Sequence, residues 1–159
     1  MKYFIADLHF SDQRIIDYEN RPFDNAKDMN ETIIRNWNGT VTEDDEVYVA
    51  GDVGDDSYVS QLKGRKYLIK GNHDTKSNED YRRCGFAEVY DYPIIIDGFW
   101  IVSHEPLYVS ENLPYANIFG HVHNSPIYKD YSKHHYCVSV ERIGYKPVEF
   151  GCISSKVNG

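Results

Sequence analysis

Side chains that bind metal ions through oxygen or nitrogen gather in five short motifs of this 159-residue chain. The motifs are Asp7-Leu8-His9, Gly51-Asp52, Gly71-Asn72-His73-Asp74, Ser103-His104 and Gly120-His121-Val122-His123. Together they contain five of the seven histidines and no cysteine. Carboxylate, carbonyl and imidazole groups suit Mn, Fe(II), Zn or Co rather than a thiolate-bound structural site. Each motif alone is more often a polar turn or an exposed loop than a metal site, so the indication comes from all five occurring in one chain.

Each motif follows an apolar run that predicts a β-strand. The runs span residues 3–6, 47–50, 67–69, 100–102 and 118–119. Side chains that follow several strands can meet at one edge of a sheet, which is where open α/β folds place their sites. The sequence therefore predicts one metal site built from five strand ends.

Residue spacing suggests how the first two motifs act within that site. Asp7 and His9 lie two positions apart on a segment expected to be extended. Their side chains should leave the same face and bind one ion together. Asp52 follows a glycine, which permits a sharp turn. Its carboxylate has two oxygens and can therefore bridge two ions.

The remaining motifs offer an amide oxygen and imidazole nitrogens. Asn72 would supply a neutral carbonyl oxygen, while its neighbour His73 would point elsewhere and remain free of metal. His121 and His123 again share one face and are spaced to reach neighbouring ions. The pair at residues 134–135 fits no such pattern, and we expect exposed loop histidines there.

The first half of the chain alternates predicted strands with predicted helices. Apolar residues at helical spacing predict helices over residues 28–37, 57–63 and 79–84, each with a glycine just beyond it. Crossover helices of this kind place consecutive strands parallel. The polar stretch over residues 11–25 predicts a long surface loop near the site.

The second half is expected to be mostly antiparallel. A two-residue Asp97-Gly98 turn between apolar runs at residues 94–96 and 99–103 predicts a hairpin. Residues 136–142 and 146–150 suggest a second hairpin around a central glycine.

The two halves together predict one α/β domain over residues 1–159. Two sheets packed face to face, with helices outside, would satisfy both patterns. The last residues, 154–159, are expected to fray.

Composition limits the environment and the partners. The net charge of −8 argues against broad affinity for nucleic acid, but two divalent ions would still leave the pocket positive enough for a phosphate. No apolar run approaches 18 residues, so no membrane span is expected, and the chain begins directly in a strand without a leader. The cysteines Cys84, Cys137 and Cys152 are odd in number and widely spaced, which favours free thiols in a cytoplasmic protein.

The order of these motifs resembles that of the calcineurin-like metallophosphoesterase superfamily, from residue 3 to about residue 150. Within it, the chain is similar to small bacterial and phage-type metallophosphatases. That similarity rests on Asp7-Leu8-His9-Phe10, Asn20-Arg21-Pro22-Phe23, Met29-Asn30-Glu31, Asn36-Trp37-Asn38, Gly51-Asp52-Val53, Leu68-Ile69-Lys70-Gly71-Asn72-His73-Asp74, Gly120-His121-Val122-His123-Asn124 and Tyr145-Lys146-Pro147-Val148. The resemblance implies the metallophosphoesterase fold, a four-layer α/β/β/α sandwich with two mixed β-sheets and two metals between loops at one sheet edge.

Carried over to the matching positions, the resemblance implies two metal sites with a shared ligand. The first ion would be held by Asp7, His9 and His123, and the second by Asn72, His104 and His121. The carboxylate of Asp52 would bridge the two ions. Two divalent ions are implied as cofactors. Manganese is expected first, and Fe, Zn, Co or Ni also fit these ligand types.

The same resemblance suggests which residues meet the substrate. His73 would lie over the phosphate as the general acid, with Asp74 orienting and polarising its ring, and Asn72 would also contact the phosphate. Arg21 is either a further phosphate contact, because a guanidinium matches phosphate oxygens, or a structural arginine. The Gly51-Asp52 motif lacks the longer Gly-Asp-x-x-Asp-Arg-Gly context of phosphoprotein phosphatases, which disfavours a protein substrate.

The resulting expectation is metal-dependent hydrolysis of a small phosphate ester, as a phosphodiesterase or phosphatase. Hydroxide formed between the two ions would attack, and His73 would protonate the leaving oxygen. Two alternatives remain open. One is a nuclease of the same superfamily, against which the acidic balance counts. The other is a scaffold that binds metal without catalysis, against which the intact His73 counts.

Overall fold

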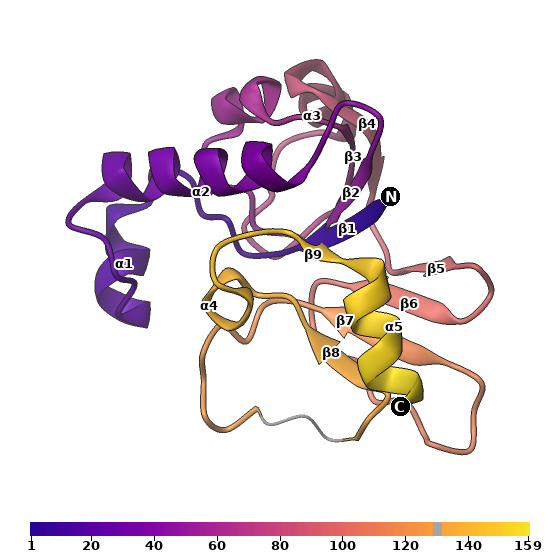
Figure 1. Cartoon of the computed structure of the whole chain (residues 1–159). Helices are drawn as coiled ribbons and strands as arrows, with labels where there is room; N and C mark the ends of the chain where they lie inside the picture. Colours follow the sequence, from indigo (N-terminus) through magenta and orange to yellow (C-terminus); the bar gives the residue numbers. More distant parts are fainter. Residues whose placement is uncertain (129–131) are drawn as a thin grey trace.

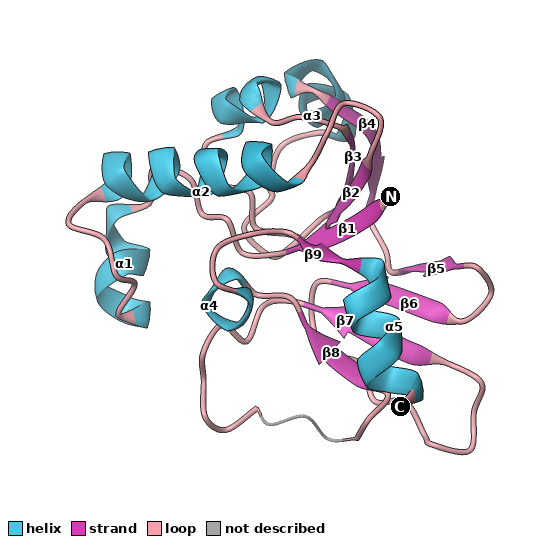
Figure 2. Cartoon of the chain, viewed as in Figure 1, coloured by secondary structure: helices cyan, strands magenta, loops and turns pink. Residues whose placement is uncertain are grey.

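Two β-sheets of mixed strand direction form the centre of this computed structural model, which describes residues 1–128 and 132–159 (Figures 1 and 2). The first sheet has the order β4-β3-β2-β1-β9 and the second the order β5-β6-β7-β8. In the first sheet β1 to β4 are parallel and β9 runs antiparallel to β1. Its strands are β1 (Lys2–Ile5), β2 (Glu46–Val49), β3 (Arg65–Ile69), β4 (Phe86–Tyr90) and β9 (Val148–Glu149).

The second sheet combines one antiparallel pair with two parallel pairs. Its strands are β5 (Ile94–Ile96), β6 (Trp100–Ser103), β7 (Ala116–Phe119) and β8 (His135–Cys137). Strands β5 and β6 form the hairpin predicted at the Asp97-Gly98 turn, whereas β6, β7 and β8 are all parallel. The prediction that the second half is mostly antiparallel is therefore wrong. Long connections return the chain to the starting edge of the sheet, so that consecutive strands run parallel.

Helices lie mainly on the outer face of the first sheet (Figure 2). This group consists of α1 (Gln13–Glu19), α2 (Ala26–Thr40), the 3₁₀ helix η1 (Asp56–Gln61) and α3 (Asn78–Cys84). Two further helices are α4 (Val140–Ile143), which follows β8 of the second sheet, and α5 (Phe150–Asn158), which follows β9 of the first. The helices predicted at 28–37, 57–63 and 79–84 thus correspond to α2, η1 and α3.

Alternation along the strands separates two hydrophobic cores. Ile5 faces the helices and packs in one cluster with Met29, Ile33 and Trp37 of α2. Its neighbour Phe4 points to the other side and packs in the cluster between the sheets. The predicted α/β sandwich with two mixed sheets is confirmed.

The predicted loop over residues 11–25 is wrong in part, since it contains α1. The Asp12 side chain accepts a hydrogen bond from the Arg14 backbone N–H and caps the helix. Ile15 and Ile16 are buried in the outer core. The helix is only seven residues long, so its periodicity is too short to stand out from a polar loop.

The predicted second hairpin is also wrong. Residues 136–142 divide between β8 and α4, while β9 leaves the second sheet altogether and pairs with β1 of the first. Gly144 is not the turn of a hairpin but the left-handed residue that ends α4. The chain therefore crosses between the two sheets at this point.

The C-terminal tail forms helix α5 instead of fraying. Ile153 and Val157 lie one helical turn apart and are buried in the core between the sheets. We expect Ile153→Ala to lower the free energy of unfolding by roughly 2–5 kcal/mol, because it leaves a cavity at a fully buried position. Urea denaturation measures the loss. Ser155→Ala on the exposed face of α5 is the matched control, and equal stability of the two variants would contradict a docked helix.

Two further observations concern the environment. No helix within residues 1–128 or 132–159 has both the length and the apolar character needed to cross a bilayer. Cys84, Cys137 and Cys152 are all free thiols, as expected.

Candidate metal centre

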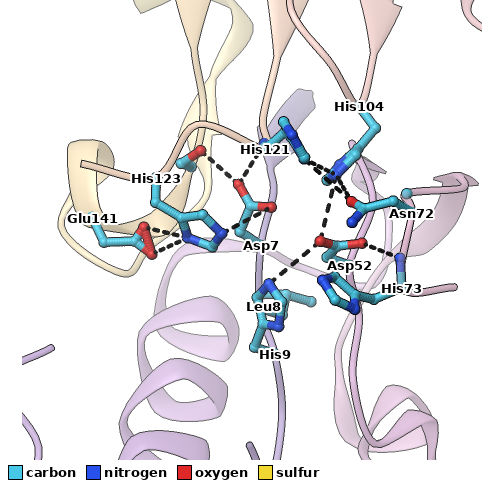
Figure 3. Close-up of polar contacts among 12 residues, drawn as sticks. Asp7, Leu8, His9, Asp52, Asn72, His73, His104, His121, His123 and Glu141 are labelled. Carbon is cyan, nitrogen blue, oxygen red and sulfur yellow. Dashed lines mark hydrogen bonds and ion pairs between the residues drawn. The ribbon is translucent and has the colours of Figure 1, made fainter. Parts of the chain in front are cut away.

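The predicted motifs meet where the parallel strands of both sheets end. Asp7 follows β1, Asp52 follows β2 and Asn72 follows β3 in the first sheet. His104 follows β6 and His121 follows β7 in the second. The two sheets present their carboxyl ends to the same place, so ligands from five strands converge there (Figure 3).

Two groups of potential ligand atoms form at this edge. In each group, three ligand atoms lie within 4.8 Å of one another. The first group is Asp7, His9 and His123, and the second is Asp52, His104 and His121. Asn72 joins the second group, because its Oδ1 lies 2.8 Å from His104 Nε2 and 3.2 Å from His121 Nδ1.

Asp52 lies between the two groups. Its Oδ2 is 3.4 Å from His9 Nε2 in the first group and 3.4 Å from His104 Nε2 in the second. Its other oxygen, Oδ1, accepts a hydrogen bond from the His73 backbone N–H at 3.0 Å. One carboxylate oxygen thus faces both groups, and the second oxygen fixes the orientation of the carboxylate.

Two buried ligand atoms of the first group have no hydrogen-bond partner among the residues that the structure describes. They are Asp7 Oδ1 and His9 Nε2. Burial of an unpaired polar atom costs roughly 1–3 kcal/mol, so such atoms call for a partner. A cation between Asp7, His9 and His123 would satisfy both, and the oxygen and imidazole donors fit a divalent transition metal.

The other atoms of these ligands are held by hydrogen bonds. Asp7 Oδ2 accepts from Ser139 Oγ at 2.5 Å and from the His121 backbone N–H at 2.9 Å. His104 Nδ1 lies 2.8 Å from the Ala50 carbonyl oxygen, which orients Nε2 toward the second group. Only the inward-facing atoms therefore remain for a metal.

The ligand-bearing turns use left-handed backbone. Asp7, His9, Asp52, His121 and His123 all have φ between 49° and 70°. This region is uncommon for residues other than glycine, although Asp, Asn and His tolerate it best. The prediction that Asp7 and His9 lie on an extended segment is wrong. Both side chains still enter the same group, because Asp7 and His9 are left-handed while Leu8 between them is not.

Glycines let the turns touch one another. A side chain at Gly51 would overlap the His104 ring and the Gly71 backbone, and one at Gly71 would overlap the Asp52 carboxylate. Gly51 also has φ of +92°. Glycine at these two positions brings the turns after β2 and β3 into direct contact.

The pKa values of Asp52 and His104 in the second group are shifted in opposite directions. Burial raises the pKa of Asp52, but the neighbouring imidazoles of His104 and His9 outweigh it and hold that pKa well below its usual range. Burial lowers the pKa of His104, yet its bond to Asp52 and the charges of Asp7 and Asp52 raise it to about 9. Without metal, His104 therefore carries a proton at neutral pH.

Asp74 does not take the position expected of it. Its carboxylate accepts hydrogen bonds from the backbone N–H groups of Asp52, Val53 and Gly71, at 2.7, 3.0 and 2.8 Å. In the described part of the chain, these bonds occupy both of its oxygens, and none goes to the His73 ring. Asp74 therefore fixes the backbone of the Asp52 turn instead of polarising His73.

Arg21 is a structural arginine, which is one of the two roles that the sequence left open. Its guanidinium is fully buried and donates to the carbonyl oxygens of Leu8 and Asp7 at 3.1 and 2.7 Å. It also pairs with Glu141 Oε1 at 2.5 Å. A guanidinium that is buried and bound through both terminal nitrogens cannot reach a substrate, so the expected phosphate contact is wrong.

Glu141 and Ser139 are site residues that the sequence did not reveal. Both Glu141 carboxylate oxygens lie 3.0 Å from His123 Nδ1, on the side of the ring away from Asp7 (Figure 3). Burial raises the pKa of Glu141, but His123 and Arg21 outweigh it and lower that pKa overall. Neither residue belongs to a recognisable motif. Both residues follow β8 at the same sheet edge as the ligands, and this position is the signal that could have identified them.

We expect Glu141→Gln to weaken metal binding at the first group about 10–100-fold. The carboxylate holds the His123 ring and makes its other nitrogen a better ligand, and a neutral amide does neither as well. Isothermal titration with Mn²⁺ measures the change. Glu149→Gln on β9, outside the site, is the control, and unchanged affinity in Glu141→Gln would contradict a role for this pair.

His73 and Asn72 are exposed at the rim of the site. The His73 ring lies 5.6 Å from the His9 ring and belongs to neither ligand group. His134 and His135 lie elsewhere, and His135 is buried in β8 with Nε2 3.0 Å from the Leu107 carbonyl oxygen. The expectation of two exposed histidines there is wrong, because His134 is half-buried and His135 is buried.

Comparison of the sequence with known proteins gives two relatives. No protein-family model matches the chain. It is 32% identical to the uncharacterized protein MJ1445 of Methanocaldococcus jannaschii over 167 residues, which cover 95% of this chain and 88% of that protein. It is also 32% identical to the Gene 66 protein of Mycobacterium phage L5 over 81 residues, which cover 45% of this chain and 39% of that protein.

Two solved structures illustrate what the fold is similar to. The protein of unknown function AQ665 from Aquifex aeolicus matches with a TM-score of 0.76 and 28% identity, covering 98% of both chains. The Pseudomonas putida nuclease MPE matches with a TM-score of 0.54 and 17% identity, covering 77% of this chain and 61% of the nuclease. At 17% identity, the match to the nuclease shows a shared fold alone.

Proposed function

Because this chain belongs to the same protein family as MJ1445 and carries two adjoining groups of metal ligands, we propose that it is a dinuclear metallophosphoesterase of the calcineurin-like superfamily. The position of Asp52 is the observation that carries the proposal. One of its oxygens lies 3.4 Å from a histidine of each group, as a ligand shared by two ions would. The fold likeness to a nuclease supports phosphate-ester chemistry.

Two divalent ions would be held by the residues already described. Asp7, His9 and His123 would hold one, Asn72, His104 and His121 the other, and Asp52 both. When bound, the ions supply Lewis acidity toward a phosphoryl group and lower the pKa of water. Manganese is our first choice of ion, with Fe, Zn, Co or Ni also suited to these donors.

The reaction we propose is hydrolysis of one ester bond. A water oxygen forms a bond to phosphorus, the bond from phosphorus to the ester oxygen breaks, and that oxygen leaves with a proton. We assign the proton to His73, because its imidazole is exposed at the rim and belongs to neither ligand group. The bond from the His73 backbone to Asp52 ties its position to the shared ligand.

The substrate we favour is a small phosphodiester or phosphomonoester. The second candidate is a nuclease, which the fold likeness to the P. putida nuclease MPE favours. The net charge of −8 disfavours the binding of long nucleic acid. The third is a scaffold that binds metal without turnover. The exposed His73 beside both groups supports an enzyme over a scaffold.

Turnover by the metal-stripped protein tests the proposal. Mn²⁺ is added back and the hydrolysis of bis(p-nitrophenyl) phosphate, p-nitrophenyl phosphate and single-stranded DNA is compared. We expect manganese-dependent turnover of the small esters and little of the DNA. Preferred cleavage of DNA would move the function to a nuclease, and two bound metals without any turnover would move it to a scaffold.

Metal affinity is expected to rise with pH below about pH 9. The pKa of His104 in the metal-free protein is raised to about 9, and a metal must displace its proton. Binding to the second group should therefore release about one proton at pH 7, and its apparent affinity should increase up to tenfold per pH unit before levelling off above the pKa. Titration calorimetry in two buffers of different ionisation enthalpy measures the release. Identical heats in both buffers would contradict it.

A further inference from the structure

A cavity of about 330 Å³ opens beside the second ligand group. Asn72 and His104 form part of its wall, on the side of the centre away from His123 and Glu141 (Figure 3). The rest of the wall comes from the end of β3, the connection between β4 and β5, and the segment after β6. Because the cavity shares Asn72 and His104 with the second ligand group, it offers space for a substituent of a phosphoryl group held at the metal groups.

The apolar part of the wall is available to a ligand. Tyr92 is 79% exposed and Leu107 is 37% exposed, and Pro93 lies next to Tyr92 in the wall. An exposed tyrosine ring beside a cavity suits stacking with a planar group. The volume lies at the lower end of the range for small-molecule sites, which fits one ligand group of nucleoside size.

The charged part of the wall disfavours a second phosphate. Among the described wall residues outside the metal groups, Lys70 is the one cation, and its Nζ is bound to Asp91 at 3.3 Å and to Asn78 Oδ1 at 3.0 Å. The other oxygen of Asp91 accepts from Asn78 at 3.1 Å. The positive charge is therefore already neutralised.

Glu105 adds a free acceptor to the wall. Its carboxylate is exposed and has no hydrogen-bond or ion-pair partner within residues 1–128 and 132–159. With Lys70 neutralised by Asp91, this carboxylate gives the part of the wall outside the metal groups a net negative charge. Such a wall repels an additional anionic group and accepts N–H or O–H donors, which a nucleoside carries on its base and its sugar.

We infer that this cavity selects a single uncharged nucleoside as one substituent of the phosphate, so that the substrates are phosphate esters of nucleosides without further phosphate groups. The inference rests on the proposed function for the phosphoryl part. Tyr92 would stack on the base, and Glu105 would accept hydrogen bonds from it or from the ribose.

Two chromogenic diesters with the same leaving group test the inference. These are the p-nitrophenyl esters of thymidine 5′-phosphate and of methyl phosphate, assayed with the manganese-loaded protein. We expect kcat/KM for the thymidine ester to exceed that for the methyl ester about tenfold or more, and Tyr92→Ala to reduce this ratio toward one. Tyr18→Ala, at an 82% exposed tyrosine of α1, is the matched control and should leave the ratio unchanged.

Charge selection is tested with the same ester carrying an added 3′-phosphate. We expect its kcat/KM to fall below that of the uncharged thymidine ester, and Glu105→Gln to restore part of the loss. Equal constants for the thymidine and methyl esters, or a preference for the 3′-phosphorylated ester, would overturn the inference while leaving the phosphoesterase proposal intact.

A binding measurement separates this inference from the proposed function. Thymidine alone is titrated into the chelator-treated protein and amide shifts are followed by NMR. In the unmodified sequence we expect shifts at Tyr92 and at residues 69–71. In Tyr92→Ala we expect no shifts at residues 69–71. If neither ester is hydrolysed with any ion, the proposed function fails and this titration still decides the cavity; no shift at millimolar thymidine would overturn the inference.

Discussion

Exchange of Asp52 for asparagine is expected to lower the number of tightly bound ions from two per chain to at most one. The carboxylate is buried, holds its negative charge strongly, and directs one oxygen at both ligand groups. Asparagine keeps the size of the side chain but removes the charge that offsets two cations. Because both ions are needed for the proposed chemistry, we expect turnover to fall by a factor on the order of 10³ or more.

Metal content after gel filtration, measured by inductively coupled plasma mass spectrometry, gives the number of ions directly. Asp56→Asn is the matched control, since Asp56 is also a buried aspartate but pairs with Lys76 outside the site. The control should keep both ions. Two ions per chain in Asp52→Asn would rule out Asp52 as the shared ligand.

Replacement of His73 by alanine is expected to keep both ions and to slow turnover about 10²–10⁴-fold for esters with poor leaving groups. The imidazole lies outside both ligand groups, so its removal leaves the ligands in place. An alkoxide needs a proton as it leaves, whereas p-nitrophenolate is stable without one. The loss should therefore be much smaller for p-nitrophenyl esters than for alkyl esters.

Rates for a p-nitrophenyl and an alkyl ester, measured beside metal content, separate this role from a structural one. His134→Ala removes a histidine outside both ligand groups and serves as the control. Equal slowing of the two esters in His73→Ala would refute proton donation. Loss of metal in the same variant would instead assign His73 to the ligand set.

The convergence of the site could be predicted from the sequence, because the motifs follow apolar strands and strand ends share a sheet edge. The structure indeed brings Asp7 together with His123, 116 positions along the chain, in one group. Asp74 and Arg21 could not be placed correctly from the sequence. Both are polar residues beside the ligands, and only the fold reveals that backbone groups of the turns already occupy their hydrogen bonds.

The errors in the second half have a different origin. Strand β8 has three residues, helix α4 has four and strand β9 has two, so none is long enough to show a period. Their identity is set by contacts with β7 and β1, which lie far away in sequence. Glu141 was missed for the same reason, since it follows a strand too short to be recognised.

The direct contact between the turns after β2 and β3 also bears on how the ions are acquired. Turns that touch backbone to backbone, and carboxylates fixed by hydrogen bonds, form a preorganised cage whose ordering is completed when the chain folds. We therefore expect ions to enter and leave the folded protein without a large rearrangement. Since oxygen and imidazole ligands of this kind accept several transition metals, we expect the supply of each metal in the surroundings to contribute to which ion would occupy the cage.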